Sequence, residues 1–190
     1  MQSDMNVLPA RGNDAIEILV NDHETIKSLL SQLTQASDGT RKGMLEQLKA
    51  VLTIHNATEE NLVYPALREV AGKKAESLKL YNETAEADSM LFQLDTMLKE
   101  GDVSKFGKVA EQLQAAILEH IDDEENKAFP HLEKGAEPQQ AQMLTQSVRE
   151  FRSALRFEPA GYQMRSTGTE IGEIGSEAPM GVSSGDIQET

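Results

Sequence analysis

The sequence predicts an all-α protein: an up-down-up-down four-helix bundle with a fifth, shorter C-terminal helix and a disordered tail. Three observations support this fold class. Apolar residues recur at the helical period through four long stretches, and the connections between these stretches are short and marked by glycine. No stretch has the composition or the alternation that is typical of a β-strand.

The bundle helices are expected in order along residues 13–134. The first begins at a cap, Asn13 or Asp14, and ends at residues 37–39, which read Ser-Asp-Gly. The second covers about residues 41–70 and the third about residues 74–99, with Gly101 as its C-terminal stop. Asp102 is expected to cap the fourth helix, which then runs to about residue 134 as one continuous element.

The remaining parts of the chain are expected outside this bundle. Residues 1–12 are polar and carry Gly and Pro, which indicates a flexible arm. Residues 138–157 predict an additional amphipathic helix that packs across or beside the bundle. Residues 158–190 are rich in Gly, Ser, Thr and Glu, and their few apolar residues are too scattered to offset the entropy of ordering. This last segment is therefore predicted to be a disordered tail.

The composition excludes several classes of function. The chain of 190 residues has 32 acidic and 18 basic residues, a net charge of −14, so no nucleic-acid or anionic-membrane partner is expected. It has no cysteine, which excludes disulfides, thiolate metal sites and cysteine nucleophiles and fits a reducing compartment. The first nine residues do not show a charged segment followed by an apolar run, and no apolar stretch reaches 18 residues, so a cytoplasmic location is expected.

A motif that occurs twice carries the main functional signal. It reads His, three residues, two glutamates, three residues, an aromatic residue and a proline, and it spans residues 55–65 and 120–130. The histidine and the first glutamate are four residues apart, so on a helix they share one face. Imidazole suits iron, zinc or copper, and a carboxylate can bridge two metals. A single pair would more often be a surface ion pair, but two copies with matching flanks predict a metal site.

The repeat extends beyond the motif and indicates an internal two-fold arrangement. Residues 21–30 align without gaps on residues 82–91, so the chain consists of two helical hairpins of similar sequence. Two-fold packing would place one set of three residues opposite another: His23, His55 and Glu59 opposite Thr84, His120 and Glu124. Each hairpin would then supply ligands to one half of a dinuclear centre.

On these residues the sequence resembles the hemerythrin-like HHE cation-binding domains over about residues 13–134. The resemblance implies a four-helix bundle that holds an oxo-bridged non-haem di-iron centre. It implies terminal histidine ligands and bridging glutamates, at His23, His55, His120, Glu59 and Glu124. It also implies dioxygen or hydrogen peroxide as the partner, and the leading interpretation is a protein that binds or reacts with these molecules in an oxidative-stress or catalase-like role.

The chain departs from the family pattern at Thr84, where members usually carry a histidine. Three outcomes follow from this departure. A neighbouring carboxylate replaces the histidine, with Asp88 as the first candidate and Glu83 and Glu86 behind it; water fills the position; or the site is mononuclear. An open position would favour peroxide chemistry, and with it a peroxide-decomposing activity, over reversible oxygen carriage.

Two other functions stay open at this point. One is an oxygen or iron sensor, or an iron-binding module without turnover, whose signal leaves through the fifth helix or the tail. The other is a degenerate, metal-free helical scaffold.

Four further residues are assigned secondary roles. Tyr64 is expected to pack, because its counterpart in the second motif, Phe129, has no oxygen. Asp22 and Asp123 either orient the ligand histidines or face water. His131 lies about 16 Å along the helix from the metal ligand of that helix and is expected at the surface.

Overall fold

The computed structural model describes residues 14–157. In chain order its elements are α1 (Ala15–Thr34), α2 (Arg41–Thr58), η1 (Glu59–Val63), α3 (Tyr64–Glu69), α4 (Lys74–Glu100), α5 (Phe106–Asp123), η2 (Glu124–Ala128), α6 (Phe129–Gly135) and α7 (Pro138–Phe157), where η1 and η2 are π-helical. No strand occurs among residues 14–157, so the all-α prediction is confirmed. The predicted arm and tail lie outside the described residues.

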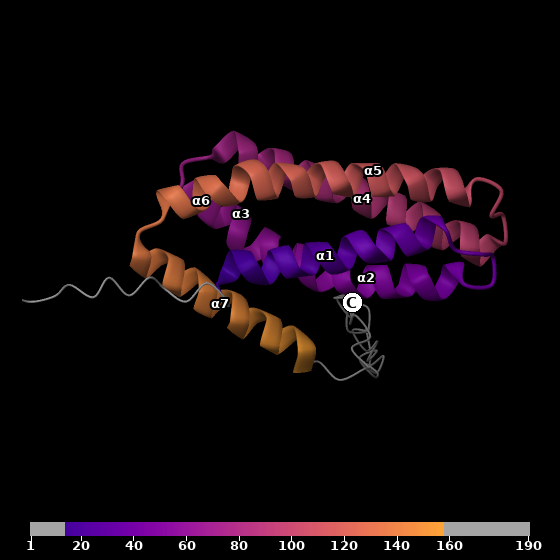
Figure 1. Cartoon of the computed structure of the whole chain (residues 1–190), viewed down its shortest axis with the longest axis horizontal. Helices are drawn as coiled ribbons and strands as arrows, with labels where there is room; N and C mark the ends of the chain where they lie inside the picture. Colours follow the sequence, from indigo (N-terminus) through magenta and orange to yellow (C-terminus); the bar gives the residue numbers. More distant parts are fainter. Residues whose placement is uncertain (1–13, 158–190) are drawn as a thin grey trace, which may run out of the picture. The chain divides into compact units, whose positions relative to one another are not determined.

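The four long helices form the predicted bundle. Helices α1 and α2 make one antiparallel hairpin, and α4 and α5 make the second (Figure 1). Each helix also contacts one helix of the other hairpin: α1 packs against α5, and α2 packs against α4. The two hairpins therefore enclose a common interior, to which all four helices contribute a face.

The ends of the helices follow the predicted signals with one exception. The Asp14 carboxylate accepts a hydrogen bond from the Glu17 backbone N–H at 2.9 Å and so caps α1. Gly101 ends α4 with a φ of 77°, a left-handed conformation that favours glycine. Asp102 does not cap the next helix, which begins only at Phe106. Its carboxylate instead accepts from the backbone and hydroxyl of Ser104, which holds a local turn.

The expected continuous helices over residues 41–70 and 102–134 are both interrupted, and at the same place in the motif. In η1 the Tyr64 N–H donates to the Glu59 carbonyl, and in η2 the Phe129 N–H donates to the Glu124 carbonyl, five residues back in each case. Prolines follow directly, at the start of α3 and α6. Proline lacks an N–H and its ring clashes with the carbonyl four residues back, so a widened turn accommodates it where a regular helix would not.

The apolar core consists of two clusters separated by a polar layer. Along α1, Leu19 belongs to the cluster that packs on α3 and α6, and Ile26 belongs to the cluster at the other end of the bundle. His23 lies between them and is fully buried. Helix α4 repeats this order, with buried Thr84 between Leu80 and Ala87. The polar layer is therefore shielded from water by apolar side chains on both sides.

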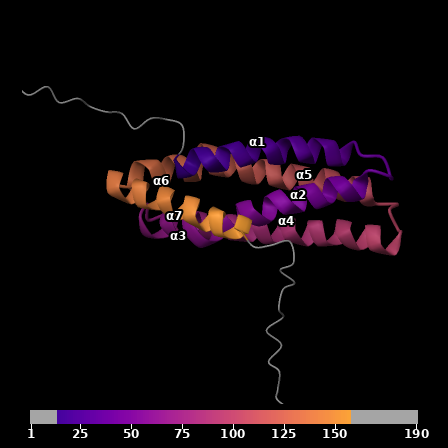
Figure 2. The ribbon, with the colours of Figure 1, turned by 90° about the horizontal axis from the view of Figure 1, so that it is seen from below.

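Helix α7 packs obliquely against α1, α2 and η1 (Figure 2). Val148 is fully buried in this contact, and the Thr145 hydroxyl accepts a hydrogen bond from the Ala15 backbone N–H at 3.1 Å. The predicted fifth helix thus covers part of the bundle that includes the first π-helical segment. Within residues 14–157, no helix combines the length and the apolar composition needed to cross a membrane.

Candidate metal centre

Five of the predicted ligands meet in the polar layer. The histidines come from three different helices, α1, α2 and α5, and the two glutamates are the first residues of η1 and η2. All five side chains are buried: His23, His55, His120, Glu59 and Glu124. Each hairpin of the bundle contributes to the layer, as the internal repeat predicts.

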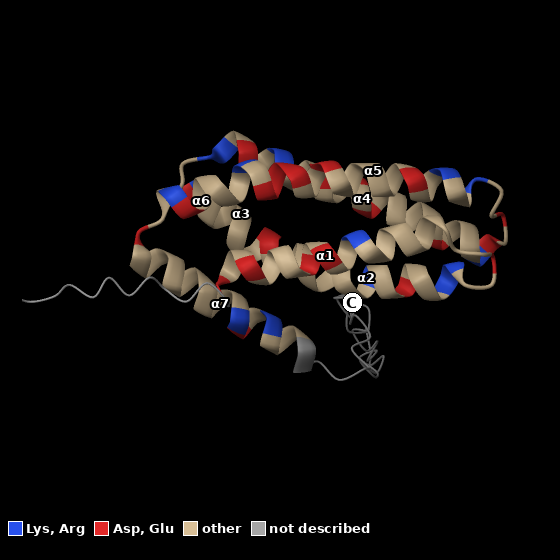
Figure 3. Ribbon diagram, viewed as in Figure 1, with Lys and Arg blue, Asp and Glu red and all other residues tan. Residues whose placement is uncertain are grey.

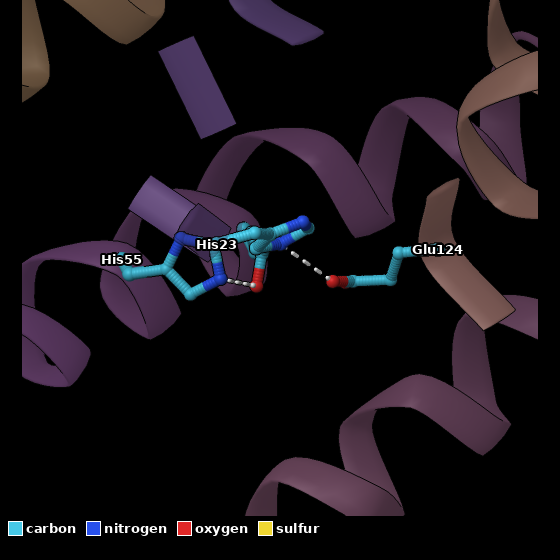
Figure 4. Close-up of side chains that lie close together, drawn as sticks. His23, His55 and Glu124 are labelled. Atoms are coloured by element: carbon cyan, nitrogen blue, oxygen red, sulfur yellow. Dashed lines mark ion pairs between the residues drawn. The ribbon is translucent and has the colours of Figure 1, made fainter. Parts of the chain in front are cut away.

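The imidazole Nε2 atoms point toward the carboxylates. His23 Nε2 lies 3.2 Å from Glu124 Oε2 and 3.9 Å from Glu59 Oε1, and the first of these contacts is visible in Figure 4. His55 Nε2 lies 3.2 Å from Glu59 Oε2, and His120 Nε2 lies 3.4 Å from Glu124 Oε1. The closest group contains one ligand atom each from His23, His55, Glu59 and Glu124, all within 4.8 Å of one another.

Tyr64 is a member of the site that the sequence interpretation assigned only to packing. Its ring does pack in the core, but its hydroxyl lies 3.1 Å from Glu59 Oε2, 2.9 Å from Glu124 Oε1 and 3.2 Å from His120 Nε2. The cause is the π-helical turn. At about 100° per residue, a regular helix would place a side chain five positions after Glu59 about 140° away from it. The turn in η1 brings residues five apart into register, so both side chains face inward.

On its outer side, each histidine contacts a carboxylate. The Nδ1 contacts are His23 with Glu125 at 2.8 Å, His55 with Asp22 at 3.4 Å and His120 with Glu83 at 3.0 Å. An ionised carboxylate only accepts hydrogen bonds, so each Nδ1 carries the hydrogen and each neutral imidazole keeps a lone pair on Nε2. The ring that supplies the lone pair is thereby turned toward the centre of the layer, as metal-ligand histidines usually are.

The structure separates the carboxylates that were candidates to replace a histidine at Thr84. Glu83 lies at the outer nitrogen of His120 and not in the group of converging ligand atoms. Asp88 is exposed and lines a groove of about 300 Å³ between α2 and α4 together with Glu60. Thr84 itself is buried, and its hydroxyl donates to the Leu80 carbonyl at 3.1 Å. Of the oxygen groups considered, the Tyr64 hydroxyl is therefore the one that lies among the converging ligands, in contact with His120 and both glutamates.

The remaining secondary residues divide as follows. Asp22 orients a ligand histidine, whereas Asp123 pairs with Lys79 and Lys127 and forms no ion pair with a histidine of residues 14–157. His131 pairs with Glu76, and its side chain is 39% exposed, which confirms a surface position. Only Asp22 of the two aspartates thus supports the layer.

Burial makes the charge state of the layer unusual. Burial and the nearby charge of Glu124 raise the pKa of Glu59 well above its ordinary value. Burial also acts to raise the pKa of Glu124, but the neighbouring histidines, with His23 first, outweigh it and lower that pKa. Burial and the two carboxylates raise the pKa of Tyr64 well above 10. Without a cation, burial therefore favours the neutral forms of Glu59 and Tyr64.

Three buried atoms in the layer have no hydrogen-bond partner among the described residues: His23 Nε2, Glu59 Oε1 and Glu124 Oε2. A buried polar atom without a partner costs about 1–3 kcal/mol. All three atoms carry a lone pair and no hydrogen, so they cannot form hydrogen bonds with one another unless a proton is added. A cation placed between them can bind all three lone pairs. The set of imidazole nitrogens and carboxylate oxygens suits a divalent first-row metal such as iron. The residues present therefore fit a metal.

Comparison with known proteins identifies the same class of domain. The family model described as "Hemerythrin HHE cation binding domain" matches residues 14–132. An uncharacterized hemerythrin-like protein of Schizosaccharomyces pombe is 25% identical over 146 residues, which cover 75% of this chain and 70% of that protein. A DNA nickase of a Nostoc species is 24% identical over 139 residues, which cover 73% of this chain but only 38% of the nickase.

A solved structure shows the same fold. The crystal structure of a hemerythrin HHE cation-binding domain-containing protein from Mycobacterium kansasii superposes with a TM-score of 0.60 at 20% sequence identity. The match covers 76% of this chain and 93% of that chain.

Proposed function

The chain belongs to the hemerythrin HHE cation-binding domain family, and on this basis we propose that it is a non-haem di-iron protein that binds or reacts with dioxygen or hydrogen peroxide. The observation that carries the proposal is the set of three buried, unpartnered atoms between two facing carboxylates. Such an arrangement is costly without a cation.

The proposed ligands divide into two sides that share the glutamates. We assign His23 and His55 to one metal and His120 to the other. Glu124 contacts both His23 and His120. Glu59 contacts His23 and His55 and also the Tyr64 hydroxyl beside His120, so both glutamates would be shared. The Tyr64 hydroxyl is adjacent to His120 and to both glutamates, so we assign it the position that Thr84 leaves without a ligand. Bound iron would supply Lewis acidity and a change of oxidation state to this layer.

A small cavity beside the polar layer is evidence that the reactant is a small molecule. It has a volume of about 20 Å³, close to what a single water molecule needs. The cavity is lined by His55, His120 and Thr84 and by apolar residues from all four bundle helices, Ile26, Leu52, Ala87, Ile117 and Ile121, together with Asn56. A molecule about the size of water fits such a space, and an organic peroxide with a bulky substituent does not.

The protein also supplies a proton donor in the polar layer beside this cavity. The Tyr64 hydroxyl keeps its hydrogen because burial and the carboxylates raise its pKa. It lies 3.2 Å from Nε2 of His120, a residue that also lines the cavity. The apolar clusters above and below keep bulk water away from it.

We propose no action on DNA, although one relative is a DNA nickase. This chain corresponds to less than two-fifths of that protein. Acidic residues also outnumber basic ones along α1 and α5 (Figure 3), and the net charge of −14 opposes the approach of phosphates.

The proposed function is tested by loading the metal-free protein with ferrous iron without oxygen and adding hydrogen peroxide. Oxygen release, one O2 for two H2O2, and the absorption spectrum are followed. Cumene hydroperoxide serves as the bulky comparison and should react far more slowly. Glu60→Ala is the matched control for Glu59→Ala, because Glu60 is in the same turn and lines the outer groove. Equal rates for both peroxides, or no reaction with peroxide or dioxygen, would contradict the proposal.

A further inference from the structure

The three histidines are supported in the same way, by a carboxylate that is itself held by a cationic side chain. Each cation contacts the carboxylate at the outer nitrogen of one histidine. The contacts are Lys27 with Glu125 at 3.1 Å, Lys79 with Glu83 at 2.7 Å and Arg152 with Asp22 at 2.6 Å. Every imidazole is thus the inner end of a chain of three groups.

Arg152 differs from the two lysines in its origin and in its burial. It lies in α7, beyond residues 14–132 that match the family, and it is 130 positions from Asp22. Both lysines lie in helices of the bundle itself. The Arg152 side chain is only 10% exposed, against 31% for Lys27 and 52% for Lys79. Water therefore competes least for the contact that α7 makes.

The ion pair between Arg152 and Asp22 is also bidentate. Its Nη1 donates to Asp22 Oδ2 at 2.6 Å, and its Nη2 donates to Asp22 Oδ1 at 3.0 Å. A paired contact between a planar guanidinium and a carboxylate fixes the orientation of both groups, which a single ammonium contact does not. Asp22 Oδ2 also accepts the hydrogen on His55 Nδ1, at 3.4 Å. Arg152 therefore fixes the position of the oxygen that accepts the hydrogen bond from His55.

We propose that Arg152 is a positioning residue of the metal centre: through Asp22 it holds the His55 imidazole with Nδ1 protonated and Nε2 toward Glu59. Helix α7 is then a structural part of the centre and not only a cover on the bundle. The effect on iron rests on the proposed function, whereas the orientation of His55 does not.

A reciprocal effect follows from this link. Because α7 contacts η1, whose first residue is Glu59, and reaches His55 through Asp22, metal binding and the docking of α7 favour each other. Iron-loaded protein is expected to resist proteolytic cleavage within α7 better than metal-free protein does.

The test compares the rate at which iron-loaded variants lose iron to a chelator. Arg152→Gln is expected to lose iron about 10- to 100-fold faster than the unchanged protein, and Arg152→Lys should fall between them. Thr145→Val is the control for docking, because it removes an α7 contact to α1 that does not involve Asp22. It should leave the rate of iron loss unchanged.

A second substitution tests whether Arg152 acts through Asp22. Asp22→Asn alone is expected to accelerate iron loss, and Arg152→Gln added to it should have no further effect. If the two effects multiply, or if Thr145→Val accelerates iron loss as much as Arg152→Gln does, the proposed positioning is wrong.

The orientation of His55 is measured separately on metal-free protein, from the nitrogen chemical shifts of its imidazole. The unchanged protein should show the Nδ1-protonated form, and Arg152→Gln should show a mixture of both neutral forms. An unaltered His55 signal in Arg152→Gln overturns the inference even if iron binds. A protein that takes up no iron but shows the expected shift change refutes the proposed function and retains the positioning role.

Discussion

The two copies of the motif adopt the same backbone and use it differently. Both run from an α-helix through a π-helical turn to a short helix that starts with an aromatic residue and proline. In the first copy the aromatic residue is Tyr64, whose hydroxyl lies among the ligands. In the second it is Phe129, whose ring stacks on His23 with 5.8 Å between centroids and 8° between planes.

The comparison explains how a site of two similar halves becomes asymmetric. In the first hairpin, α1 supplies His23, whereas the corresponding residue of the second hairpin is Thr84. The aromatic residues differ in a complementary way. Phe129, which packs against His23, has no oxygen, whereas Tyr64 brings a hydroxyl to His120, on the side where Thr84 replaces a histidine. The backbone repeat thus provides two equivalent positions, and a single oxygen atom on Tyr64 makes them chemically different.

The largest effect is expected when either shared carboxylate is removed. Glu59→Ala and Glu124→Ala should each reduce the iron content to background, because both halves of the centre depend on each glutamate. Iron per chain is measured after anaerobic loading. Retention of iron in both variants would mean that the two motifs do not form one centre.

Removal of the Tyr64 hydroxyl, which only the first copy of the motif carries, should have the next largest effect on the site. Tyr64→Phe makes the two copies alike and leaves three buried groups without that partner, so metal-free protein should lose about 1–3 kcal/mol of unfolding free energy. Iron-loaded protein should also show a changed absorption spectrum. Tyr81→Phe is the matched control, because the Tyr81 hydroxyl donates to the Glu60 carbonyl, outside the layer. Identical spectra for the unchanged protein and Tyr64→Phe would exclude Tyr64 from the iron site.

The two glutamates should also differ in their dependence on pH when no metal is bound. The pKa of Glu59 is raised above 4.5 by burial and by Glu124, so its contribution to stability is present below pH 4.5 and is lost as the pH rises toward its folded value. The unfolding free energy of the unchanged protein relative to Glu59→Gln should therefore fall above pH 4.5, by at most about 1.4 kcal/mol per pH unit.

Glu124 should show the opposite dependence. Its pKa is lowered below 4.5 by the neighbouring histidines, against the effect of burial, so its contribution is present above pH 4.5 and is lost as the pH falls. Urea unfolding of both Gln variants from pH 3.5 to 7.5 measures the two differences. Curves that run parallel would show that the two carboxylates are equivalent.

The smallest effect is expected for Asp88→Asn. The residue lies in the outer groove with Glu60, away from the converging ligand atoms, so iron content and spectrum should stay unchanged. Loss of one iron from this variant would restore Asp88 as the group that replaces a histidine at Thr84.

The sequence was sufficient for the features that depend on regular helices. The helical period of the apolar residues predicts the bundle, and the spacing of four residues between His55 and Glu59 places both on one face. The comparison with Phe129 predicts only packing for Tyr64, and the inward position of its hydroxyl requires a turn that a regular helical period does not contain. The recurrence of an aromatic residue before proline is the available signal for that turn.

The carboxylates and cations that contact the outer nitrogens of the histidines are harder to predict for a different reason. The contacts of Asp22 with His55 and of Glu83 with His120 join residues on different helices, and nothing in the local pattern specifies them. Arg152 is 130 positions from its partner and lies in a helix whose packing depends on the whole bundle. Only the arrangement in three dimensions brings such residues together.

The most direct test of the metal centre is the amount of iron bound per chain after anaerobic loading, together with the absorption spectrum after exposure to oxygen. Two irons per chain, with a spectrum that changes on oxidation, are expected from the two sides that share Glu59 and Glu124. A folded protein that binds one iron would contradict the dinuclear centre, and one that binds none would contradict the metal site itself.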